Sequence, residues 1–145
     1  MLLALVLAAT TLFASQSGPT GPVERPFHVI VNASNPIASI GREELSAIFM
    51  KKLSRWPSGA DVVPIDQLPE SSLRERFSRL VHGKSTGYVI RYWHRLIFAG
   101  RAIPPREAQN DAAVIDLVRT QRGAIGYVSS RALLPEGVKT IEVRP

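Results

Sequence analysis

Val62-Val-Pro-Ile-Asp66 and Glu70-Ser-Ser-Leu-Arg-Glu-Arg-Phe77 together form the stretch that decides the fold. The first segment is a short apolar run typical of a buried strand, and the second begins a helix at two serines. Ser72 with Glu75 matches the capping box, in which each side chain bonds the other residue's backbone N–H. A strand that runs into a serine-capped helix also presents unpaired N–H groups at the positive end of the helix dipole. The stretch therefore predicts a strand–helix unit and a candidate site for an anion.

The chain on either side continues an alternation of strands and helices. Apolar periodicity of three and four residues predicts helices over 42–52, 71–82, 85–98 and 111–121. Short β-rich runs predict strands over 27–33, 62–65, 124–128 and 138–143, with the last at the edge of the sheet. Leu80 and Ile97 are expected on the inward stripes of their helices. This order predicts an α/β fold in which helices cover a partly parallel, mixed sheet.

The N-terminus is expected to be an export signal. Residues 2–14 form an uncharged apolar run that is too short to span a bilayer and suits the apolar part of a signal peptide. A buried core helix is the alternative. The polar, Gly/Pro-rich segment that follows favours the signal. We therefore expect a signal peptide at 1–16, a flexible linker at 17–25 and the folded domain at 26–145, with a periplasmic location.

Composition narrows the chemistry. The 145-residue chain contains no cysteine, which excludes disulfides, thiolate catalysis and cysteine-bound metals. Its formal net charge of +6 attracts anions of any kind. The three histidines have no partner at metal-ligand spacing, so neither a metal nor a cofactor is expected. No P-loop, GxGxxG or nucleophile elbow is present, so we expect no enzyme activity.

The Ser71-Ser72 helix start is the principal candidate site, because hydroxyls and unpaired N–H groups can coordinate phosphate or sulfate. Simple helix capping is the alternative interpretation. The loop after the first strand supplies the other candidates, Asn32, Ser34 and Asn35, since loops that follow strands often line ligand crevices. Such loops also turn corners without binding anything.

A basic surface is a further candidate. It would comprise Arg74, Arg76, Arg79, Arg91 and Arg95 with Lys51 and Lys52, and the aromatic residues Trp56, Tyr88, Tyr92 and Trp93 lie between them in sequence. Arginines interleaved with aromatic residues are typical of single-strand nucleic-acid binders. The periodicity instead places Trp93 in the core and the arginines on solvated helix faces, so no nucleic-acid partner is expected.

Three segments resemble the phosphate-binding proteins that serve ABC transporters, a branch of the type II periplasmic binding proteins. They are Leu45-Ser-Ala-Ile-Phe-Met50 with Trp56-Pro-Ser-Gly59, then Val63-Pro-Ile65 with Glu70–Phe77, and Gly123-Ala-Ile-Gly-Tyr-Val128. The resemblance spans residues 27–130 and implies a single periplasmic-binding-protein-like lobe. Alignment on Phe77 places Ser71 on a phosphate-binding serine of the family, whereas a family arginine falls near Asp66 or Gln67.

The resemblance implies an exported, non-catalytic domain that binds phosphate or a related oxyanion and is linked to phosphate ABC transport. Ser71 and Ser72 would contact the anion, and Asn32, Ser34 and Asn35 would line the same crevice. The alternative function is a protein-interaction or sensory module that keeps the lobe fold without tight ligand binding. The partners implied are a small anion, a membrane transporter or sensor protein, and a second copy in a homodimer.

Overall fold

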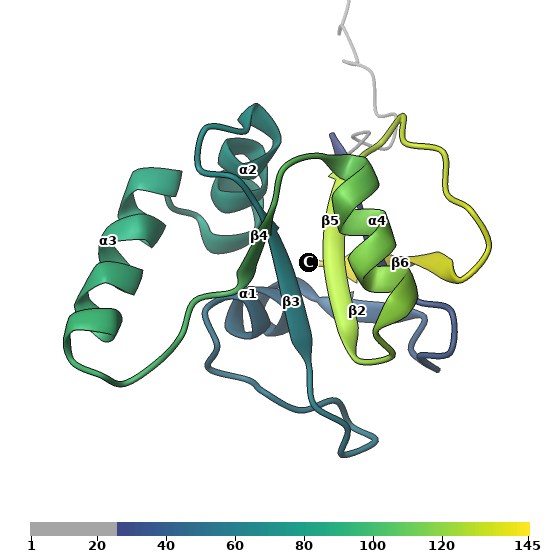
Figure 1. Ribbon diagram of the computed structural model, residues 1–145, viewed down its shortest axis with the longest axis horizontal. Coiled ribbons are helices and arrows are strands. Elements are labelled where there is room, and N and C mark those ends of the chain that lie inside the picture. The colour runs from purple at the N-terminus through teal and green to yellow at the C-terminus, as the bar shows by residue number, and fades with distance from the viewer. Residues whose placement is uncertain (1–25) are drawn as a thin grey trace, which may run out of the picture.

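One mixed sheet of six strands lies at the centre of the computed structural model, which describes residues 26–145 (Figure 1). The strands are β1 (Phe27–Asn32), β2 (Ser39–Gly41), β3 (Val63–Gln67), β4 (Arg106–Ala108), β5 (Ala124–Ser129) and β6 (Val138–Arg144), in the order β2-β6-β1-β5-β3-β4. β1 is antiparallel to β5 and β6, whereas β3 is parallel to β5 and β4. The C-terminal ends of β3 and β5 therefore lie together at one end of the strands of the sheet. The C-terminal end of β1 lies at the opposite end of the strands.

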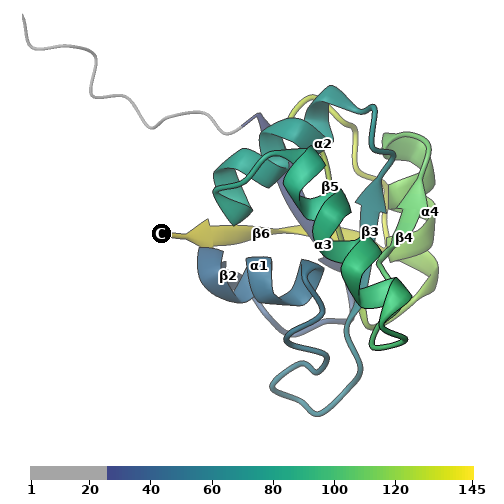
Figure 2. The ribbon, with the colours of Figure 1, turned by 90° about the vertical axis from the view of Figure 1, so that its left-hand side faces the viewer.

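Helices cover both faces of this sheet. They are α1 (Arg42–Phe49), α2 (Ser72–Phe77), the π-helical turn η1 (Ser78–His82), α3 (Thr86–Phe98) and α4 (Asp111–Thr120). α4 packs on one face through Val114 and Val118, and α1, α2 and η1 pack on the other. α3 lies outside this sandwich, against η1, as Figures 1 and 2 show. The predicted α/β fold, a mixed sheet flanked by helices, is confirmed.

Alternation along the central strands divides the core into two layers. Val29 and Val31 of β1 face α1 and α2, whereas Ile30 between them faces α4. On β5, Gly126 leaves room for α4, since a Cβ built there would lie 2.6 Å from the Cγ1 of Val114. The glycine therefore sets how closely α4 packs on the sheet.

Several sequence predictions are wrong in detail. The strand at Val138–Arg144 is not at the edge, because β6 lies between β1 and the short strand β2, which the sequence analysis missed along with β4. Leu80 is 50 % exposed, since the π-helical geometry of η1 shifts the inward stripe by one position. Ile97 is 47 % exposed because α3 extends past the sheet. The predicted signal peptide and linker fall within residues 1–25, outside the described residues.

Candidate functional site

The start of α2 holds the principal candidate from the sequence. Ser71 is the N-cap residue, and its hydroxyl accepts a hydrogen bond from the N–H of Arg74 and donates one to Oε1 of Gln67, at 2.9 Å. Ser72 is exposed, and within residues 26–145 no acceptor pairs with its N–H or with that of Leu73. The Ser71 hydroxyl is thus engaged by the protein, whereas the two amides have no acceptor in the described residues and Ser72 is exposed.

The predicted capping box is wrong. Glu75 does not turn back to the start of α2, because its carboxylate accepts the N–H of Thr86, at 2.9 Å, at the start of α3. That bond lowers the pKa of Glu75, because it stabilises the charged form, and Arg79 adds an ion pair. Glu75 therefore joins two helices rather than closing one.

A shallow depression opens beside these unpaired amides. Ser72, Leu73 and Arg76 of α2 form one wall, and Asn110, Asp111 and Ala112 at the start of α4 form the opposite wall. Asn110 caps α4 by accepting the N–H of Ala113 on its side-chain oxygen. Two helix N-termini thus meet at one depression, at the end of the sheet where β3 and β5 finish.

Asp111 places a negative charge in that depression. Its two carboxylate oxygens accept the side-chain N–H of Gln67, at 3.0 Å, and the backbone N–H of Ser129, at 3.1 Å. These bonds tie α4 to the ends of β3 and β5. The carboxylate opposes an incoming anion, although both of its oxygens already have donors.

Beneath the depression lies a buried ionic network. The guanidinium of Arg74 lies 3.1 Å from the Asp66 carboxylate and donates to the Gln67 carbonyl oxygen and to the Glu107 carboxylate. The Tyr127 hydroxyl donates to the other oxygen of Asp66. Asp66, which the family alignment places near an anion-binding arginine, is therefore buried in the interior and neutralises Arg74.

Burial shifts the pKa values of this network. Removal from water raises the pKa of Asp66, and the nearby Arg74 opposes that shift. Burial, with the adjacent Asp66 charge, also raises the pKa of Tyr127, so the hydroxyl stays protonated and acts as a donor. The two terminal nitrogens of Arg74 are paired within this network and its Nε is buried without a partner in the described residues, so this arginine is not available to an anion in the depression.

The loop after β1 lies at the opposite end of the strands from Ser71. The Asn32 side-chain amide donates to the carbonyl oxygens of Val118 and Arg119 at the end of α4. Ser34 bonds Asn32, and Asn35 accepts a bond from the backbone of Ile37. The expectation that Asn32, Ser34 and Asn35 share a crevice with Ser71 is therefore wrong, because β1 runs antiparallel to β5 and carries its C-terminal loop away.

The sequence analysis missed three residues that shape the end of the sheet where β3 and β5 finish. Arg74 was expected on a solvated face, but only 3 % of it is exposed, whereas Trp93 is buried as predicted. Gln67 and Asp111 had no motif to mark them. One signal was available: a carboxylate inside an apolar strand, such as Asp66, requires a buried cation nearby.

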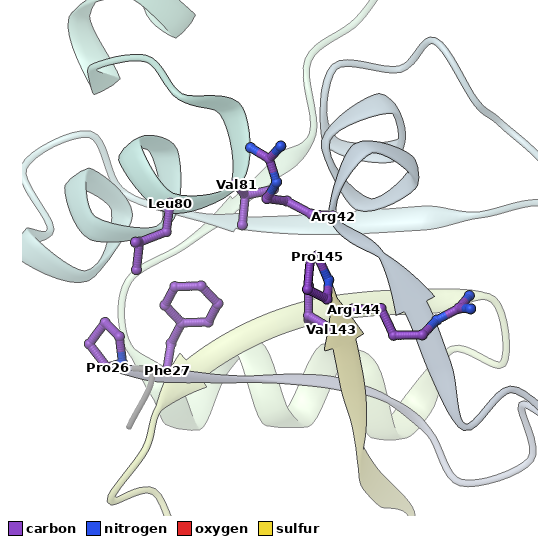
Figure 3. A pocket seen from close by; sticks show the side chains of 8 residues that line it. All are labelled: Pro26, Phe27, Arg42, Leu80, Val81, Val143, Arg144 and Pro145. Atoms are coloured by element: carbon purple, nitrogen blue, oxygen red, sulfur yellow. The ribbon is translucent and has the colours of Figure 1, made fainter. Parts of the chain in front are cut away.

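A second cavity, of about 370 Å³, contains none of the predicted residues (Figure 3). Its walls are largely apolar, and Arg42 and Arg144 stand at its rim with their guanidinium groups pointing to different sides. Across residues 26–145 no cluster of metal-ligating side chains is found, and no helix is long and apolar enough to cross a membrane.

Comparison with known proteins identifies the fold. No family model and no curated protein sequence matches the chain. Among solved structures, a Clostridium perfringens protein with bound phosphate, assigned as a phosphate ABC transporter substrate-binding protein, superposes with a TM-score of 0.64 at 19 % identity. An ABC-type phosphate transport receptor from Vibrio cholerae gives 0.64 at 17 % identity. This chain has a substrate-binding-protein fold.

The match is partial in length. Each superposition covers 81 % of this chain, but only 44 % and 46 % of the two neighbours. The chain thus spans less than half of each substrate-binding protein that it matches. At these identities the likeness establishes the fold, in agreement with the single lobe implied by the sequence resemblance.

Proposed function

We propose that this protein is an exported, non-catalytic domain that binds phosphate or a related oxyanion in the depression between α2 and α4. The observation that carries the proposal is the meeting of unpaired donors there: the N–H groups of Ser72 and Leu73, the Ser72 hydroxyl and the exposed Arg76. Hydrogen bonds from such groups to an anion are stronger than neutral ones. The phosphate-binding neighbours support the same class of ligand.

The affinity is expected to be low. The depression is open to water, the Asp111 carboxylate lies in its wall, and Arg74 is held by Asp66 and Glu107. Each hydrogen bond made in water contributes roughly 0.5–1.5 kcal/mol. A dissociation constant on the order of 1 mM, equivalent to roughly 4 kcal/mol, is therefore the expected result.

Binding can be tested by the ³¹P linewidth of phosphate titrated with the full chain. Arg76→Gln and Ser72→Ala should each weaken binding several-fold, because each removes one donor. Arg122→Gln, an exposed arginine outside the depression, is the charge-matched control. No broadening of the ³¹P signal at millimolar phosphate, or an equal loss of phosphate binding in the Arg122→Gln control, would contradict the proposal.

The link to transport is a further part of this proposal. A periplasmic domain of this fold would pass its anion to a phosphate ABC transporter, as the descriptions of the neighbours suggest. A second copy in a homodimer would replace the part of the neighbours that this chain does not match. Loss of the gene should then slow phosphate uptake at limiting phosphate, and unchanged uptake would argue against the link.

One observation favours the second candidate function, an interaction or sensory module without tight ligand binding. The Ser71 hydroxyl donates to Gln67, and the two terminal nitrogens of the Arg74 guanidinium are paired with Asp66 and Glu107. Such a lobe is stable without a ligand. A chain that gives no ³¹P response and can be crosslinked to a transporter or sensor protein in the envelope would support this candidate over anion binding.

A further inference from the structure

The segment from Arg76 to Arg106 carries charge of one sign only. It contains no Asp or Glu, and its basic residues are Arg76, Arg79, Lys84, Arg91, Arg95, Arg101 and Arg106. The segment includes all of α3, which stands outside the sandwich and faces the viewer in Figure 2. The segment therefore contributes seven positive charges and no negative ones, and two of them, Arg91 and Arg95, lie within α3.

The outer face of α3 combines arginines with aromatic side chains. Tyr88, Arg91, Arg95 and Phe98 follow one another at spacings of three, four and three residues, so they lie on one stripe, and all four are exposed. The inner face is apolar and buried through Val89 and Trp93. The exposed stripe is thus not required for packing the helix onto the domain.

The end of this helix is apolar and unprotected. Phe98 is 90 % exposed and Ile103 is 78 % exposed, and Ile97 and Ile103 line a common depression. Exposed large apolar residues grouped as Ile97 and Ile103 are here are characteristic of interaction sites, and Phe98 is the residue next to Ile97 in the chain. Here they are flanked by Arg95 and Arg101.

Acidic groups near the helix are already paired. Glu75 binds the Thr86 N–H and Arg79, and Glu107, beside Ile97 and His94 in the adjoining groove, binds Arg74. The arginines of the exposed stripe have no carboxylate partner within residues 26–145. The surface is therefore available to an external anion.

We propose that the stripe Tyr88–Arg91–Arg95–Phe98, with Ile103, binds the surface of a bilayer rich in anionic phospholipid. Arginines would contact the phosphate groups while Phe98 and Ile103 enter the boundary between headgroups and acyl chains. A second copy of this chain would bring like charges together. A soluble polyanion would leave the two apolar side chains in water. A bilayer satisfies both features at once.

The absence of cysteine allows a position-specific test with the full chain. Phe98→Cys carrying an environment-sensitive fluorophore is mixed with vesicles of phosphatidylcholine alone or with added phosphatidylglycerol. Leu133→Cys, at a position that is 92 % exposed outside the stripe, is the matched control. Because the label reports its own position, contact made through residues 2–14 would not imitate the result.

The expected result is a blue shift at position 98 with phosphatidylglycerol vesicles, none with phosphatidylcholine, and no shift at position 133. Arg91→Gln with Arg95→Gln should weaken partitioning about 30-fold. Arg122→Gln with Arg131→Gln, which removes the same charge elsewhere, should change it far less. No shift at position 98, equal shifts at both positions, or the same shift with soluble polyglutamate or DNA would overturn the proposal.

Discussion

Arg74 and the pair Arg91 and Arg95 are alike in sequence, since all are arginines within short amphipathic helices, but the fold uses them in opposite ways. Arg74 is buried between Asp66 and Glu107, whereas Arg91 and Arg95 are exposed on α3 with no carboxylate partner in the described residues. The strand β3 brings a carboxylate to Arg74, whereas no element within residues 26–145 brings one to Arg91 or Arg95. An arginine's partner, more than its helix, therefore decides whether it stabilises the fold or remains available to a ligand.

The largest expected effect comes from removing the buried cation. Arg74→Met would leave Asp66 buried without a counter-charge and should lower the free energy of unfolding by about 3–5 kcal/mol. Urea denaturation measures this loss. Arg91→Met should change it by less than about 0.5 kcal/mol. If the double variant Arg74→Met with Asp66→Leu regains free energy of unfolding, the pairing of Arg74 with Asp66 is supported. Equal losses of stability for the Arg74 and Arg91 variants would contradict the contrast between a buried and an exposed arginine.

The second effect is a pH dependence of the free energy of unfolding, and it comes from His82 at the end of η1. His82 is partly buried against Phe77, and burial lowers its pKa from 6.5 to about 4, with Arg74 and Lys52 contributing. Because the unfolded chain then binds more protons, stability is complete above pH 6.5 and falls as the pH drops toward 4. The loss approaches about 3 kcal/mol. His82→Gln should remove this dependence, whereas the exposed His94→Gln should preserve it.

Two glycine-to-alanine substitutions, one in β5 and one in α3, should have smaller effects on stability, and these effects should be opposite in sign. Gly126→Ala in β5 brings a Cβ to 2.6 Å from Val114 and should destabilise the protein by about 1–3 kcal/mol. In Gly87→Ala in α3, the new Cβ would make ordinary contacts with the Arg91 guanidinium, at 3.5 Å, and the Ser85 hydroxyl oxygen, at 3.9 Å, so the change should stabilise the protein by up to about 0.5–1 kcal/mol. Thermal unfolding of the two variants measures whether each change in stability is a gain or a loss. A loss of stability at position 87 would contradict the open packing of this face of α3.

Much of the fold follows from the sequence, because helices and strands with a single buried face have a readable period. The N-caps Ser71, Ser85 and Asn110 lie at or one residue from the predicted helix starts. The short strands β2 and β4 were missed because three residues carry no period. The position of β6 in the sheet was missed because strand order depends on long-range pairing.

The candidate site was harder to predict. Ser71 and Ser72 could be found because capping chemistry is local. The error over Asn32 arose because a loop after a strand can lie at either end of the sheet, and only the antiparallel pairing of β1 with β5 decides which. The roles of Gln67 and Asp111 depend on contacts 44 residues apart in the chain, which no local pattern reveals.

The central claim is that the unpaired amides at the start of α2 receive an oxyanion, and ¹⁵N–¹H spectra recorded during a phosphate titration test it most directly. The account predicts saturating shifts of the Ser72 and Leu73 amides at millimolar phosphate, with chloride at equal ionic strength causing none. Unmoved resonances at these two positions, or shifts confined to the Asn32–Asn35 loop, would contradict it.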